Sequence, residues 1–219
     1  MRREHTQSAL NTAMGEYRRR RNAPVTDFLI LVNILVFLYV ALRGGMRDDE
    51  ILLRYGASYT PYLTERHEYW RLLTAAFLHF GIRHLGNNMF ILFVTGDNLE
   101  RALGHVKYLI FYLFSAVGAS ACSLAVEVWM GRKILSAGAS GVVFAVLGGL
   151  IWVLIRNRGR FEEFRIRNLL FFSGIMLLSG FFTEGVDNAA HAGGLLVGFL
   201  LAVVLYRRPT ATRFRTDMT

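Results

Sequence analysis

The chain has 219 residues, of which 53% are hydrophobic and 19% are charged, and its formal net charge is +9. The apolar fraction is higher than in an ordinary soluble domain, which argues against a soluble globular fold and points to lipid as the solvent. A net charge of +9 could indicate nucleic-acid binding, so the positions of the basic residues have to decide that question.

Six apolar stretches approach the length of roughly 20 residues that a helix needs to cross a hydrocarbon core. They lie at residues 28–42, 72–96, 106–126, 137–155, 169–183 and 189–206. Their apolar residues run continuously and do not alternate with polar ones, as they would in the strands of a membrane barrel. The sequence therefore predicts an all-α integral membrane protein built as a bundle of six transmembrane helices.

The basic residues lie between the apolar stretches and gather at residues 18–21, 156–167 and 207–215. With six spans, these three segments fall on one side of the membrane, which the positive-inside rule identifies as the cytoplasm. Both termini are therefore expected in the cytoplasm and the chain in the cell membrane, as in the bacterial inner membrane. Orientation and anionic lipid explain the positive charge, so membrane lipid is an expected partner and nucleic acid is not.

Three parts of the chain follow from this topology. Residues 1–24 are expected to form a basic cytoplasmic segment, 25–207 the six-helix domain and 208–219 a cytoplasmic tail. The longest loop, at residues 43–71, is rich in Tyr and ends near Trp70. We expect it to lie in the outer interface, because Trp and Tyr favour the level of the lipid headgroups.

A few polar residues stand at the outer ends of the predicted spans. Buried polar groups in a membrane span are costly unless they are paired, so each is a candidate for a functional role. They are His79, His84 and Asn88 in the second span, Ser140 at the start of the fourth and His191 at the start of the sixth. These three spans all run from outside to inside, so the polar residues are expected to share one depth in the outer leaflet.

Small residues recur at every fourth position in the fourth and sixth spans, a pattern that lets helix backbones approach closely. The two series are Gly141, Ala145 and Gly149, and Ala190, Gly194, Gly198 and Ala202. Ser140 and His191 stand next to the first members of these series, which predicts that they come within hydrogen-bond reach. A serine beside a neutral imidazole is an activated nucleophile. His84, Asn88 and the backbone N–H of Ser140 are then candidate donors to the oxyanion of an acyl-transfer intermediate.

Other interpretations of these residues remain open at this point. A serine in a membrane helix often only packs against its own backbone, and the histidines could be interfacial residues or metal ligands. Three histidines without nearby carboxylates or Cys would make a weak metal site, so no metal is expected. Asp187 precedes His191 by four residues and could be the third member of a triad. We favour an N-cap role for Asp187 and a Ser-His dyad.

The combined motifs resemble the rhomboid family of intramembrane serine proteases, in particular its bacterial six-span type. The matching residues are Trp70 and Arg71, His79, His84 with Asn88, Glu100 and Arg101, Gly138 to Gly141, and Ala190 to Gly194 with Gly198. They cover residues 70–198 in the order and spacing of the family. A Gly-x-Ser-Gly match alone would be a weak signal, whereas the whole set is specific.

The resemblance implies the catalytic roles. Ser140 would attack the scissile carbonyl, and His191 would act first as base and then as acid. His84, Asn88 and the Ser140 amide would form the oxyanion hole. No cofactor is implied.

The resemblance also implies supporting roles. His79 would support water and loop structure near the site, and Trp70 and Arg71 would hold the membrane-lying outer loop. Phe144 stands where many relatives carry a tyrosine stacked on the catalytic histidine, so its ring can stack but the hydroxyl is missing. Glu100 and Arg101 would be structural.

The expected activity is hydrolysis of peptide bonds in or next to the transmembrane helices of membrane-protein substrates, through an acyl-enzyme, at a site that opens to the outer side. Two other classes of protein are considered. One is a rhomboid-like protein that binds membrane helices without cutting them, although such proteins usually lack the dyad. The other is a small transporter or channel, which should place polar residues at several depths.

Overall fold

The computed structural model describes residues 22–44, 48–161, 164–183 and 185–208. The basic segment expected at 1–24 and the tail expected at 208–219 therefore lie almost entirely outside the described residues. Nearly all of the helical domain expected at 25–207 is described.

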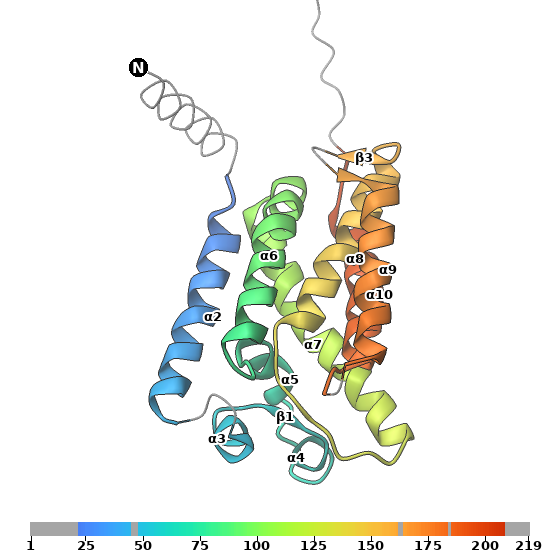
Figure 1. The fold of residues 1–219 in the computed structure, drawn as a ribbon. Coiled ribbons are helices and arrows are strands. Elements are labelled where there is room, and N and C mark those ends of the chain that lie inside the picture. Colours follow the sequence, from blue (N-terminus) through green and yellow to red (C-terminus); the bar gives the residue numbers. More distant parts are fainter. Residues whose placement is uncertain (1–21, 45–47, 162–163, 184, 209–219) are drawn as a thin grey trace, which may run out of the picture.

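Long helices lie side by side along one common direction (Figure 1). Within the described residues, those of 16 residues or more are α2 (Pro24–Leu42), α6 (Ile82–Leu103), α7 (His105–Trp129), α8 (Ser140–Arg156), α9 (Ile166–Phe181) and α10 (Asn188–Leu205). Among the described helices, α2, α7 and α10 are long and apolar enough to cross a membrane, and α8 and α9 are apolar but shorter. The prediction of a helical membrane protein is confirmed as far as the type, length and apolar composition of these helices are concerned.

The second, fourth and sixth long helices, α6, α8 and α10, begin at the same end of the bundle (Figure 1). That end also holds short elements: α3 (Asp49–Arg54), β1 (Ser58–Tyr59), α4 (Thr60–Thr64), α5 (Arg71–Thr74) and the 3-10 helix η1 (Ala75–Phe77). β2 (Leu135–Ser136) pairs antiparallel with β1, with Ser58 opposite Ser136. A hairpin of β3 (Arg160–Phe161) and β4 (Phe164–Arg165) closes the opposite end.

The second apolar stretch was predicted as one span from residue 72, and this boundary is wrong. The long helix α6 begins only at Ile82, after two separate short helices, α5 and η1. Leu78 is extended, with φ −97° and ψ 151°, and Gly81 has φ +87°, a conformation that favours glycine. Hydropathy reports apolar composition and does not detect such a reversal of the backbone.

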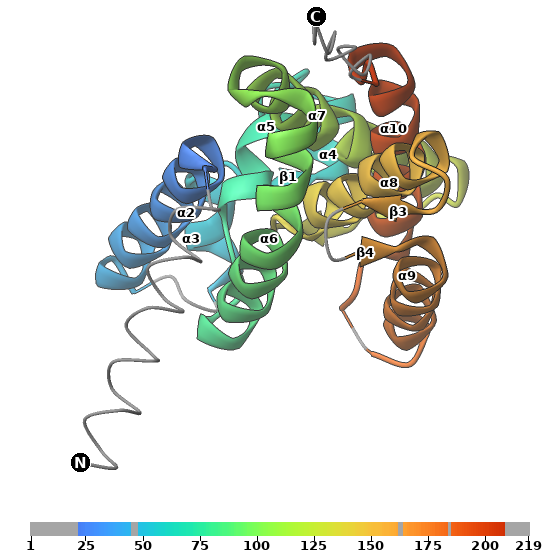
Figure 2. The same ribbon diagram turned by 90° about the horizontal axis from the view of Figure 1, so that it is seen from above.

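The central helix of the bundle is α8, which packs against α6, α7, α9 and α10 (Figure 2). The predicted close approach of the fourth and sixth spans is confirmed, because a Cβ added at Gly194 would meet the Gly141 carbonyl and one at Gly198 would meet the Ala145 carbonyl. Gly149 was expected in the same contact but instead faces side chains of α6 and α7. The reason is that an α-helix has 3.6 residues per turn, so every fourth residue drifts around the axis, and Gly148 meets α10 in its place.

The start of α2 is capped by a residue from another helix. Ala23 supplies no side-chain cap. Instead Glu100, fully buried on α6, accepts hydrogen bonds from the Val25 and Thr26 backbone N–H groups at 3.0 and 2.7 Å and from the Thr26 hydroxyl at 2.7 Å. Its other contact is His105 Nδ1 at 2.6 Å. The structural role that the resemblance implies for Glu100 thus has a physical basis, which is to dock α2.

Glu100→Ala should destabilise the bundle, because it leaves buried N–H donors unpaired at the start of α2. We expect the free energy of unfolding to fall by about 3 kcal/mol. The measurement is denaturant unfolding in detergent, with Glu65→Ala, which removes an exposed carboxylate, as the control. Equal unfolding midpoints for the two variants would contradict the capping role.

Candidate active site

Ser140 is the first residue of α8, and His191 lies in the first turn of α10. The two helices touch at this point, because a Cβ added at Gly141 would lie 3.6 Å from the Ala190 carbonyl oxygen. Gly141 and Ala190, the sequence neighbours of Ser140 and His191, therefore lie close together, with room for little more than a methyl group between them. His191 is 9% exposed, and its Nδ1 atom is buried without a hydrogen-bond partner among the described residues.

The ring of Phe144 holds the plane of the His191 imidazole. The two rings stack with centroids 4.3 Å apart and planes 26° apart, and Phe144 is only 1% exposed. Phe144 follows Ser140 by one helical turn, so α8 carries both the serine and the ring that orients the imidazole. Stacking needs only the aromatic ring, and phenylalanine supplies it without a hydroxyl.

His84 and Asn88 lie in the first two turns of α6. The His84 imidazole packs against Gly138, where an added Cβ would lie 2.6 Å from His84 Cε1. Gly138 also has φ +147°, so a side chain there would be both strained and blocked. Asn88 is 5% exposed, and its Nδ2 donor is buried with no partner among the described residues. Because an unpaired buried donor costs about 1 to 3 kcal/mol, this amide is available to a ligand oxygen.

His79 lies just before α6 and supports the backbone that leads into Ser140. Its Nε2 atom accepts a hydrogen bond from the Ala139 N–H at 3.4 Å, and its ring meets that of His84 edge to face at 5.2 Å. Burial, reinforced by the neighbouring His84 imidazole, lowers the pKa of His79 well below its usual value. The ring is therefore neutral at neutral pH, as a nitrogen that accepts a hydrogen bond must be.

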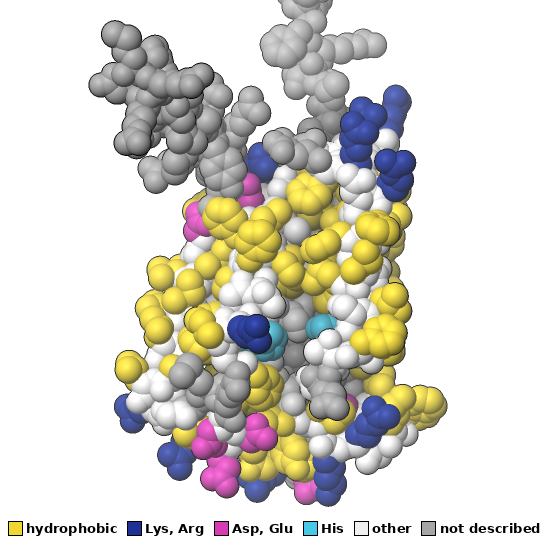
Figure 3. Space-filling model, viewed as in Figure 1, with side chains coloured by type: hydrophobic (Ala, Val, Ile, Leu, Met, Phe, Trp, Pro, Cys, Tyr) yellow, Lys and Arg dark blue, Asp and Glu magenta, His cyan; other side chains and the backbone are white. Residues whose placement is uncertain are grey.

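The start of α8 has further donors for an anion. Ala139 supplies no side-chain cap, so no cap side chain occupies the first backbone N–H groups of the helix. These groups carry the positive end of the helix dipole and favour negative charge. Figure 3 shows histidine side chains within a hollow on the face of the molecule between α6 and α9.

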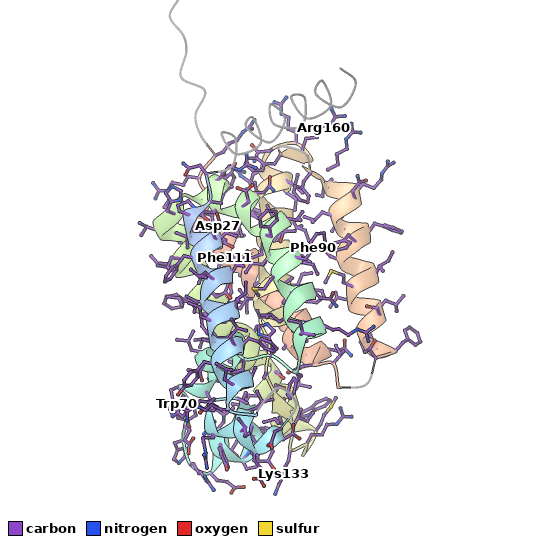
Figure 4. All side chains as sticks on the ribbon, turned by 60° about the vertical axis from the view of Figure 1, so that its left-hand side comes forward. Asp27, Trp70, Phe90, Phe111, Lys133 and Arg160 are labelled. Carbon is purple, nitrogen blue, oxygen red and sulfur yellow. The ribbon has the colours of Figure 1, made fainter. Side chains whose placement is uncertain are left out.

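Trp70 and Arg71 belong to the long loop at residues 43–71 rather than to the hollow. Arg71 is 5% exposed, donates to the carbonyls of Leu53 and Ala57 at 2.6 and 3.1 Å, and pairs with Glu68 at 2.6 Å. Its guanidinium also stacks over the Trp70 ring at 4.5 Å. Arg71 therefore pins together the segments of this loop, and Trp70 lies on its surface (Figure 4).

Asp187 is the N-cap of α10, as favoured from the sequence, since its side chain accepts a hydrogen bond from the Ala190 N–H at 2.8 Å. It also accepts from Ser123 and Ser136, two residues that the sequence reasoning missed. Ser123 lies inside the third apolar stretch, so the rule applied to the other polar residues could have found it. Within the described residues, no three His, Cys, Asp or Glu side chains are grouped to hold a metal ion.

The fold is that of a helical, multi-pass membrane protein with a polar site between the starts of three helices. A family model described as the Rhomboid domain matches residues 66–208. This match covers more than half of the chain, which therefore belongs to the rhomboid family.

Individual relatives agree with this assignment. The rhomboid protease GluP of Bacillus subtilis (strain 168) is 35% identical over 180 residues, which cover 82% of this chain and 34% of GluP. The mitochondrial RHOMBOID-like protein 6 of Arabidopsis thaliana is 35% identical over 74% of this chain and 52% of its own length. The rhomboid protease AarA of Providencia stuartii is 29% identical over 86% of this chain and 75% of AarA. The chain thus spans only a third to a half of the first two relatives.

Proposed function

We propose that the protein is an intramembrane serine endopeptidase that hydrolyses peptide bonds in or next to the transmembrane helices of membrane-protein substrates. The observation that carries this proposal is the close approach of α8 and α10 at Gly141 and Ala190, the sequence neighbours of Ser140 and His191, together with the stacking of His191 on Phe144. Membership of the rhomboid family and the names of the relatives GluP and AarA support it.

In this mechanism, Ser140 Oγ attacks the scissile carbonyl while a ring nitrogen of His191 takes the hydroxyl proton. The oxyanion accepts hydrogen bonds from Asn88 Nδ2, the His84 ring and the Ser140 N–H. Collapse of this intermediate breaks the C–N bond, and His191 returns the proton to the leaving amine. Water then attacks the acyl-enzyme with His191 again as base, which releases the acid and restores Ser140.

The proposal includes six membrane-spanning helices, α2 and α6 to α10, within a domain at residues 25–207. Both terminal segments, 1–24 and 208–219, would be cytoplasmic, and the chain would lie in a cell membrane such as the bacterial inner membrane. The supporting observation is the charge distribution, since the Arg-rich hairpin with Arg160 lies at the opposite end of the bundle from Trp70 (Figure 4). The starts of α8 and α10 then face the outer leaflet, so the site would open to the outer side.

A rhomboid-like protein that binds membrane helices without cutting them is less well supported. Binding alone requires neither a serine at the start of α8 nor an imidazole stacked on the Phe144 ring. The unpaired donor of Asn88 likewise suits a charge that develops during a reaction better than an apolar helix.

A serine-reactive probe tests the proposal directly. The protein in liposomes is incubated with a fluorophosphonate and, separately, with a model single-span membrane protein. We expect one phosphonyl group on Ser140 by peptide mass spectrometry and loss of cleavage in proportion to labelling. Ser179→Ala, on α9, is the control and should be labelled like the parent. Labelling of another residue, or no cleavage by the unlabelled parent, would contradict the proposal.

A further inference from the structure

One carboxyl group connects the start of α10 to two other segments. Asp187 Oδ1 accepts from the Ala190 N–H at 2.8 Å, which caps the helix. Asp187 Oδ2 accepts from the Ser123 hydroxyl on α7 at 2.6 Å and from the Ser136 hydroxyl on β2 at 2.8 Å. Both oxygens of Asp187 are therefore occupied by donors from α10, α7 and β2.

The positions of these partners relate the network to the proposed dyad. Ser136 precedes Ser140 by four residues, and Asp187 precedes His191 by four. The Ser136–Asp187 hydrogen bond thus joins the two segments that lead into the helices carrying the nucleophile and the base. β2 is itself fixed to the outer loop through its pairing with β1. Without this bond, only the packing of α8 on α10 further along the two helices would fix the distance between their first residues.

The network continues from Ser123 to the outer loop. Ser123 Oγ lies 3.0 Å from Glu127 Oε1, and Glu127 Oε2 accepts from the Thr60 hydroxyl at 2.6 Å. Thr60 Oγ1 in turn accepts from the Ile134 N–H at 3.1 Å. Ser123, Glu127 and Thr60 are each no more than 5% exposed. Buried hydrogen bonds of this kind hold their partners more firmly than exposed ones.

The single hydroxyl proton of Ser123 links the protonation of Asp187 to that of Glu127. Ser123 has one hydroxyl proton, yet its oxygen lies within hydrogen-bond distance of both Asp187 and Glu127. Both contacts become hydrogen bonds at once only when one of the carboxyl groups carries a proton. An amide in place of Asp187 would donate to Ser123 and free the serine proton for an ionised Glu127.

Asp187 makes no hydrogen bond to His191 in this structure, as the third member of a triad would. Its two oxygens are used by other donors, and His191 Nδ1 has no hydrogen-bond partner among the described residues. The carboxylate lies close enough for its charge to act on the His191 imidazole without a hydrogen bond. Asp187 therefore has two routes to catalysis, which are its charge and the positions of the helices that it ties together.

We propose that Asp187 is a positioning residue that sets the distance between Ser140 and His191 by tying the start of α10 to α7 and to the β2 segment that precedes α8. This inference rests on the proposed dyad. It adds that position, rather than negative charge beside the imidazole, is what Asp187 contributes.

The test compares Asp187→Ala, Asp187→Asn and Ser136→Ala in liposomes, at a temperature well below the unfolding midpoint of each. Asp187→Ala should lower kcat for a model single-span substrate by about 10- to 100-fold, the loss typical of reacting groups misplaced by about 1 Å. KM should change by less than about twofold, since the site that receives the substrate is not altered. The rate of fluorophosphonate labelling of Ser140 should fall by a similar factor to kcat.

Asp187→Asn should restore kcat to within about threefold of the parent, because asparagine caps helices as well as aspartate does. Ser136→Ala should fall between the two. Asp48→Ala is the matched control. It removes a comparable N-cap, the one on α3 that accepts from Glu50 and Ile51, and should leave kcat unchanged.

Two results would overturn the inference. One is an Asp187→Asn enzyme as impaired as Asp187→Ala, which would mean that the charge acts directly. The other is a parental kcat and labelling rate in Asp187→Ala, provided that the parent cleaves and Ser140→Ala does not. Cleavage by the Ser140→Ala protein is a separate outcome, since it would remove the proposed dyad itself.

Discussion

Replacement of Ser140 by alanine should lower kcat for a transmembrane substrate by at least about 10⁴-fold, as expected when the nucleophile of a serine hydrolase is removed. Without the hydroxyl no acyl-enzyme can form, and only direct attack by water remains. The fold should be unaffected, because Ser140 provides no cap at the start of α8 and its backbone is unchanged. The unfolding midpoint should therefore stay close to that of the parent.

His191→Ala should cause a similar loss of kcat, since a neutral serine is a poor nucleophile. It should also lower stability, because it removes the stacking partner of the buried Phe144 and leaves a cavity. The double variant should be no slower than either single variant, since the two residues act as one unit. The measurement is product formation in liposomes, with Ser179→Ala as the active control. Cleavage by Ser140→Ala at more than about 1% of the parental rate would show that another group supplies the nucleophile.

The depth of the site residues in the bundle was predictable, because it depends on the residue types at the ends of the helices. Loop charge assigns a direction to each span, and that direction places Ser140 and His191 at the same end of the bundle. The structure has both residues in the first turns of α8 and α10. Asp187 was likewise predictable as an N-cap, because capping depends on residue type and on position relative to one helix.

Features that depend on contacts between distant segments were not predictable in the same way. The extended Leu78 and the positive φ of Gly81 lie within an apolar stretch and leave no mark in its hydropathy. Gly148 rather than Gly149 faces α10, because the every-fourth-residue pattern ignores the drift of a helix around its axis. Glu127 falls just beyond the predicted third span, so its link through Ser123 to Asp187 required the fold to be known.

Gly198→Ala should reduce both stability and activity. An added Cβ would meet the carbonyl group of Ala145, which is backbone and can move only if α8 and α10 separate. Overpacking of this kind costs about 1 to 3 kcal/mol in the free energy of unfolding. A separation of about 1 Å at the dyad would lower kcat by roughly 100-fold.

The control is Gly174→Ala, on α9, where an added Cβ would meet nothing within 4 Å. That change should stabilise the protein by up to about 1 kcal/mol, because alanine favours a helix over glycine. Denaturant unfolding in detergent and cleavage in liposomes measure the two effects for both variants. If Gly198→Ala matched the parent in both measurements, α8 and α10 could separate without moving Ser140 from His191. In that case the Asp187 hydrogen bonds at the helix starts would be enough to hold Ser140 and His191 together. If Gly198→Ala instead lost kcat, the close contact at Gly198 would be required as well, because this variant leaves the Asp187 hydrogen bonds in place.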